Sequence, residues 1–280
     1  MAGTNRQSTL CPRCRRLISS DERLCPYCGL TRPASPLKNN PLVRALFGEG
    51  GVIKYLLWTN IAMFLLSILL NPRTIGLSLN PLTFLSPDSL SLLRLGATGT
   101  IPIDRLGRWW TLVSANYLHG GILHIFFNMM ALYQIAPLAL REFGRYRFII
   151  IYTLGGIGGF YVSYLAGVTF TIGASAALCA LLGAVIYYGK SRGGVYGQAI
   201  YRQIGGWALG ILAFGLLVPG INNWGHGGGF AVGALLGLAL GYNEKYPENR
   251  FHGLLAFLCI GLTLLVLLWA VVIGVYYRVS

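Results

Sequence analysis

The chain has 280 residues, of which 55% are hydrophobic and 11% charged, and it carries a formal net charge of +14. A soluble domain contains roughly a quarter charged residues, so the composition excludes a water-soluble globular protein and predicts an integral membrane protein. Lys and Arg cluster before the first apolar segment and between later ones, which is the positive-inside pattern. That pattern argues against a nucleic-acid partner and for a lipid bilayer.

The first 36 residues are polar and contain four of the six cysteines, Cys11, Cys14, Cys25 and Cys28, in two Cys-x-x-Cys pairs. Two thiolates at this spacing bind one metal ion from a tight turn, and two such pairs complete a tetrahedral site. We therefore expect a structural zinc knuckle at 1–36. Iron in a rubredoxin-like site and two disulfides are the alternatives. The positive-inside pattern places this segment in the reducing cytoplasm, where disulfides are rare.

A linker is expected at 37–51, where Pro41 and the run from Gly48 to Gly51 interrupt regular structure. The polar residues before position 52 lack the short apolar core of a cleavable signal peptide. The N-terminus is therefore expected to stay in the cytoplasm.

Seven apolar segments then predict membrane-spanning helices, at 52–70, 119–140, 147–167, 173–189, 204–219, 226–242 and 253–277. Several are shorter than the ~20 residues of a typical span, so hydropathy alone would miss one. The N-terminal region and the connections at 141–147, 190–203 and 243–252 hold most of the 22 Lys and Arg residues. We therefore expect a multi-pass protein of the plasma (cell inner) membrane, with its C-terminus outside.

The connection from 71 to 118 is long for a tight bundle, yet it contains apolar clusters around Leu92 and around Trp109 and Trp110. Paired Trp residues favour the membrane interface. We expect this connection to be folded and to lie partly in the outer leaflet.

Polar side chains inside a membrane are costly, so each is a functional candidate. No Asp or Glu falls within the core of a predicted span, which excludes an intramembrane aspartyl dyad and disfavours ion-coupled transport. No His-Glu-x-x-His metalloprotease motif is present either. The remaining candidates are His119, His124, Asn128, Ser175 and His226.

The spacing of small residues predicts that two of these candidates lie close together. Glycine recurs every four residues from Gly225 to Gly241, and Ser175, Cys179 and Gly183 have the same spacing. Such faces let two helices approach closely in lipid, which would bring His226 to Ser175 as a base beside a nucleophile. The alternatives are a serine bonded to its own helix backbone and glycines that serve packing alone.

Taken in order, four motifs resemble the rhomboid family over about residues 52–242. They are Gly107-Arg-Trp-Trp-Thr-Leu, Leu118-His119-Gly-Gly-Ile-Leu-His124-Ile-Phe-Phe-Asn128, Gly173-Ala-Ser175-Ala and His226-x-x-Gly229-x-x-x-Gly233. The resemblance implies an all-α, six-helix protease core at 52–242 and an additional C-terminal helix at 253–277. It also implies a serine endopeptidase that cleaves transmembrane segments of other membrane proteins.

The same resemblance assigns roles. Ser175 would attack the peptide bond and His226 would be the general base, without a third carboxylate and without a catalytic cofactor. His124 and Asn128 would stabilise the oxyanion with the Ser175 N–H group, and His119 would support them.

Two positions depart from the family pattern, Ala176 in place of glycine and Cys179 in place of an aromatic residue that packs on the histidine ring. A catalytically inactive rhomboid-like protein that binds membrane clients is the alternative function. Retention of Ser175, His226 and Asn128 argues against it. A channel or transporter is disfavoured because no internal repeat is evident.

Overall fold

The computed structural model describes residues 8–11, 15–27, 29, 33–34, 51–72 and 84–279. The chain divides into two compact units, Met1–Tyr55 and Leu56–Ser280. The predicted linker at 37–51 lies outside the described residues, except for Gly51 at the start of the first long helix.

The N-terminal unit contains a short hairpin. Strands β1 (Ser8–Leu10) and β2 (Leu17–Ser19) pair antiparallel, with Thr9 opposite Ile18. Ile18 is buried in one cluster with Cys11 and Cys25. The hairpin therefore brings the first cysteine of each Cys-x-x-Cys pair to the same small core.

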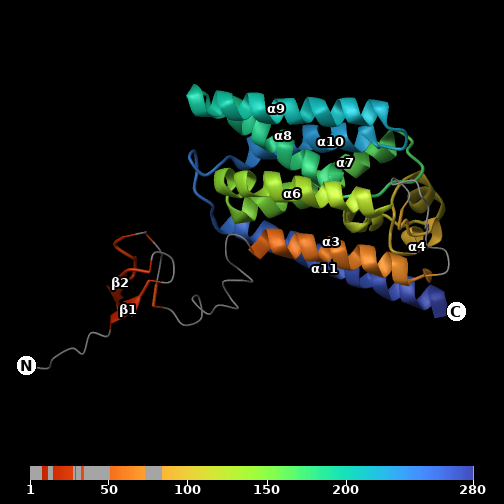
Figure 1. Cartoon of the computed structure of the whole chain (residues 1–280), viewed down its shortest axis with the longest axis horizontal. Coiled ribbons are helices and arrows are strands. Elements are labelled where there is room, and N and C mark those ends of the chain that lie inside the picture. Colours follow the sequence, from red (N-terminus) through yellow and green to blue (C-terminus); the bar gives the residue numbers. More distant parts are fainter. Residues whose placement is uncertain are drawn as a thin grey trace, which may run out of the picture. The chain divides into compact units, whose positions relative to one another are not determined.

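The second unit is helical (Figure 1). Its elements are α3 (Gly51–Leu69, which begins in the first unit), α4 (Ser89–Arg94), the π-helix η2 (Ile101–Arg105), α5 (Thr111–Ser114), the 3-10 helix η3 (Ala115–Tyr117), α6 (Ile122–Phe143), α7 (Arg145–Leu165), α8 (Ser175–Arg192), α9 (Gly194–Leu217), α10 (Asn223–Leu240) and α11 (Arg250–Val279). Among the described residues, α3, α6, α7, α9 and α11 are long and apolar enough to cross a membrane. The fold is a polytopic all-α membrane fold, as the composition predicts.

All seven predicted segments are helical, but two predicted loops are wrong. A single residue, Gly144, separates α6 from α7, and Gly193 alone separates α8 from α9. Both have positive φ, 83° and 65°, a conformation that glycine adopts without steric cost. The basic residues assigned to the loops at 141–147 and 190–203 therefore lie within helices, and Arg141, Lys190 and Arg192 are in last turns, where cations interact favourably with the helix dipole.

Two further boundaries matter for the site. Helix α10 begins at Asn223, so His226 is its fourth residue and not the first residue of its helix. Helix α6 begins at Ile122, so His119 precedes the helix that was predicted to contain it. Asn222 caps α10 by accepting a hydrogen bond from the Gly225 N–H group.

Helix α8 lies at the centre of the unit and packs against α6, α7, α9 and α10. Its contact with α10 is very close, as the glycine spacing predicts. A Cβ atom at Gly229 would overlap the carbonyl oxygen of Ala176, and one at Gly233 would overlap that of Ala180. The two helix backbones therefore touch along this face.

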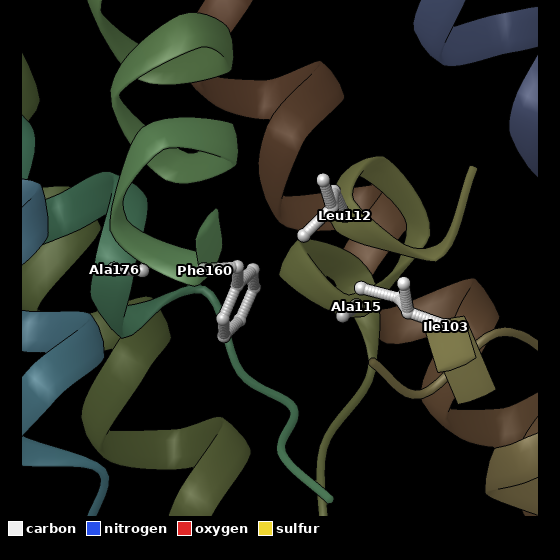
Figure 2. Packing of buried hydrophobic residues seen from close by; sticks show 5 residues of the cluster. All are labelled: Ile103, Leu112, Ala115, Phe160 and Ala176. Carbon is white, nitrogen blue, oxygen red and sulfur yellow. The ribbon is translucent and has the colours of Figure 1, made fainter. Parts of the chain in front are cut away.

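The connection before α6 is folded from residue 84 onward, which agrees with the prediction for this part of it. A hydrophobic cluster joins it to the bundle, formed by Ile103, Leu112, Ala115, Phe160 and Ala176. Figure 2 shows the Phe160 ring of α7 between Ala176 of α8 and the three residues of the connection. The first turn of α8 therefore packs against this hydrophobic cluster.

Candidate active site

Ser175 is the first residue of α8 and is half-buried. The segment before it is fixed by backbone hydrogen bonds to the folded connection. Thr171 and Thr98 exchange two of them, at 2.7 and 3.0 Å, and the Gly173 N–H group donates to the carbonyl oxygen of Ala115 at 2.9 Å. The position of Ser175 therefore depends on residues distant in sequence.

Gly173 lies between Ser175 and the imidazole of His124. Its φ is +127°, and a Cβ atom there would lie 2.7 Å from Nε2 of His124 and 3.6 Å from Oγ of Ser175. Glycine is required on both counts, because a side chain would be strained and would collide with the imidazole. The two functional side chains flank one small space.

A local hydrogen bond orients His124. Its Nδ1 atom accepts from the Gly120 N–H group at 3.3 Å, so the proton of the neutral imidazole is assigned to Nε2. The Nε2 atom is the one that faces Gly173. His124 therefore directs a hydrogen-bond donor into the space beside Ser175.

Asn128 is buried one helical turn after His124, as the spacing predicts. Its amide donates to the carbonyl oxygen of His124 at 3.0 Å. This bond uses one of the two amide hydrogens, so the other is available to a second acceptor.

His226 is half-buried in the first turns of α10. Its Nδ1 atom is buried and has no hydrogen-bond partner among the described residues. The contacts of the preceding residue, Gly225, locate this turn of α10. A Cβ atom added at Gly159 of α7 would lie 2.7 Å from the Gly225 carbonyl oxygen and 3.1 Å from Cβ of Ala176 in α8. The start of α10 therefore meets α7 and the first turn of α8 together.

His119 is fully buried, and its ring meets that of His124 edge-on, with centroids 5.1 Å apart. Neither ring nitrogen of His119 has a partner within the described part of the chain. His119 thus supports His124 by packing rather than by a hydrogen bond.

The cysteine pairs of the N-terminal unit form two similar turns. The Arg15 N–H group donates to the Cys11 carbonyl oxygen at 2.8 Å, and the Gly29 N–H group donates to that of Cys25 at 2.9 Å. Arg15 and Gly29 both have positive φ, 57° and 69°. Cys14 and Cys28 lie outside the described residues, and no group of three metal-ligating side chains occurs within them.

Sequence reasoning missed two residues that hold the site together, Thr171 and Asn222. Asn222 had a usable signal, because an Asn just before a helical segment is a common N-cap. Thr171 had none, since its backbone partner Thr98 is remote in the sequence.

The chain is similar to known proteins of one family. Residues 106–243 match the model of the Rhomboid domain. RHOMBOID-like protein 4 of Arabidopsis thaliana is 34% identical over 169 residues, covering 60% of this chain and 42% of that protein. Rhomboid protease GluP of Bacillus subtilis (strain 168) is 36% identical over 156 residues, covering 56% and 31%. RHOMBOID-like protein 1 of Arabidopsis thaliana is 31% identical over 209 residues, covering 67% and 52%.

The chain spans about half or less of the length of these relatives. It is a multi-pass, all-α membrane protein in which residues 106–243 resemble the Rhomboid domain. The matches support membership of the rhomboid family.

Proposed function

We propose that this chain is an intramembrane serine endopeptidase that cleaves transmembrane segments of other membrane proteins. The observation that carries the proposal is that a Cβ atom at Gly173 would lie within 4 Å of both Ser175 Oγ and His124 Nε2, while the first turn of α8 packs close to the first turn of α10. A curated relative named a rhomboid protease, GluP, adds support at the level of the family. Ser175 is the nucleophile and His226 the general base.

In the proposed reaction, His226 transfers protons between Ser175 and the substrate. His226 accepts the proton of Ser175 Oγ as the oxygen attacks the peptide carbonyl, and the resulting imidazolium donates it to the leaving amine. A water molecule, activated by the same histidine, then hydrolyses the ester on Ser175. The predicted spans contain no Asp or Glu in their cores, so the histidine acts without a third carboxylate.

In this proposal, three hydrogen-bond donors stabilise the negative charge that develops on the carbonyl oxygen of the substrate. The Ser175 N–H group belongs to the first turn of α8, where backbone donors have no partner within the helix. The Nε2–H group of His124 and the second amide hydrogen of Asn128 complete the proposed set. Such donors are worth several kcal/mol in a site shielded from water.

A fluorophosphonate probe tests the proposal, because it labels only an activated serine. We expect labelling of the wild-type protein and none of Ser175→Ala or His226→Ala. Ser191→Ala, at the opposite end of α8, should be labelled like the wild type and serves as the control. A well-folded wild-type protein that is not labelled would favour the inactive, client-binding alternative.

We also propose that the N-terminal unit binds a structural zinc ion through Cys11, Cys14, Cys25 and Cys28. The burial of Cys11 and Cys25 in one cluster and the two similar turns support it, because thiolates converging from two turns suit tetrahedral zinc. Elemental analysis should find about one zinc ion per chain. Iron, or two disulfides found by mass spectrometry, would overturn the assignment. Deletion of residues 1–36 should leave fluorophosphonate labelling unchanged.

The remaining proposals concern the substrates, the membrane location and the orientation of the chain. The substrates are membrane proteins with transmembrane segments, the location is the plasma (cell inner) membrane, and nucleic acid is not a partner. The N-terminus is cytoplasmic and the C-terminus is outside, on the basis of the Lys and Arg distribution.

A further inference from the structure

We infer that Asn222 is a positioning residue, which fixes the helix of His226 relative to the segment that carries Ser175. The catalytic part of this inference rests on the proposed function. Asn222 touches neither of the two side chains and acts through the backbone elements that hold them.

The side chain of Asn222 forms three hydrogen bonds. Its Nδ2 atom donates to Oγ of Ser163 in α7 at 2.7 Å and to Oγ1 of Thr171 at 2.9 Å. Its Oδ1 atom accepts from the Gly225 N–H group at 2.9 Å. Both hydroxyl partners are buried, Ser163 with 1% and Thr171 with 7% of its surface exposed. Both amide hydrogens are therefore used.

The backbone of Asn222 adds a direct connection to the proposed base. Its carbonyl oxygen accepts from the N–H group of His226 at 3.1 Å. On the other side, Thr171 is four residues before Ser175 and is paired through its backbone with Thr98. One residue thus links the turn of His226 to the fixed segment before Ser175.

The remaining contact between α10 and its neighbours explains why such a link is needed. Gly228, Gly229 and Gly233 face α7 or α8 with no side chain. Contacts of this kind bring helices close by packing, without a directional bond. At the N-terminal end of α10, the two bonds from the Asn222 amide join the helix to α7 and to the segment before α8.

The neighbouring Asn223 provides a matched control. Its amide donates to the Gly215 carbonyl oxygen of α9 at 2.8 Å, so it anchors the same end of α10 to a helix that carries neither functional residue. Loss of its side chain removes a buried hydrogen bond of similar strength without releasing α10 from Thr171.

The first experiment tests the link without reference to activity. The free energy of unfolding is measured for Asn222→Ala, Thr171→Val and the double variant. Because the two side chains share a hydrogen bond, the double variant should lose less than the sum of the single losses. Asn223→Ala with Thr171→Val should be additive. Additivity of Asn222→Ala with Thr171→Val would overturn the inference, whether or not the protein is a protease.

The second experiment tests positioning. Thr171→Val keeps the side-chain shape and the backbone pairing but removes the acceptor, so kcat and the rate of fluorophosphonate labelling should fall about tenfold while KM changes little. Thr171→Ser restores the hydroxyl and should restore both rates. Asn223→Ala should label at the wild-type rate.

The outcomes separate the two proposals. A folded wild-type protein that does not label overturns the proposed function and with it the catalytic role of Asn222, whatever the unfolding data show. A wild-type protein that labels, together with Thr171→Val that labels equally fast, overturns the positioning role alone. Loss in Thr171→Val and recovery in Thr171→Ser support it.

Discussion

Gly173 leaves no room for any other residue, and this has a measurable consequence. In Gly173→Ala the new methyl group would collide with the His124 imidazole, so His124 must move away from Ser175. We expect the rate of fluorophosphonate labelling to fall at least about tenfold, the factor that 1.4 kcal/mol of lost stabilisation produces. Gly167→Ala is the control, because Gly167 also has positive φ, +80°, but has open space around it. Equal rates in the two variants would contradict the placement of His124.

Asn128 supplies one of several proposed oxyanion donors, so its loss should be partial. Asn128→Ala is expected to lower kcat by about 10- to 1000-fold without abolishing cleavage. Turnover of a transmembrane substrate in detergent or liposomes measures the effect.

His252→Ala is a suitable comparison for Asn128→Ala because His252 exchanges two hydrogen bonds with Asn249 at the start of α11. Its loss should cost on the order of 1 kcal/mol of stability, as for a helix cap, with little effect on kcat. A complete loss of activity in Asn128→Ala would assign that residue a larger role than oxyanion binding.

The residues of the candidate site can be singled out from the sequence, but the hydrogen bonds that connect their segments cannot. Ser175, His226, His124 and Asn128 stand out because polar groups are rare in apolar helices. The bonds that position them come from Thr98, Ala115, Thr171 and Asn222. Such bonds join segments far apart in the chain, and no local pattern reveals them.

At the scale of elements, the contact of α8 with α10 depends on Gly233, whose added methyl group would overlap the Ala180 carbonyl oxygen. Gly233→Ala should therefore force the helices apart and destabilise the protein by about 1–3 kcal/mol, as overpacking does. Thermal unfolding in detergent measures the change. Gly227→Ala, in the same helix but with open space around it, should be neutral or slightly stabilising. Equal destabilisation of both variants would refute a specific contact.

The helices themselves were predictable because each apolar run has few charges, even where the run is shorter than a typical membrane span. Their ends were less predictable, because Lys and Arg were taken to mark loops. Arg192, for example, lies in the last turn of α8 and forms an ion pair with Glu244 at 2.7 Å. Long cationic side chains can leave a helix end toward water, so a charged residue does not require a loop.

For the whole molecule, the same ion pair bears on the predicted orientation. It places Arg192 and the connection after α10 at one end of the bundle, as the topology requires. A reporter inserted near Lys245 should therefore be cytoplasmic, and one fused after Ser280 should be outside. Accessibility labelling in intact cells distinguishes the two sides. A reversed result would place the candidate site on the cytoplasmic face.

The helices α8 and α10, with 18 residues each, are less apolar than α6, α7, α9 and α11, which are long and apolar enough to cross a membrane. We expect α8 and α10 to depend on inserted neighbours to remain in the bilayer, because a less apolar helix gains less from burial in lipid. These two are also the helices that carry Ser175 and His226. We therefore expect Ser175 and His226 to come together late in assembly, once the neighbouring helices are in the bilayer.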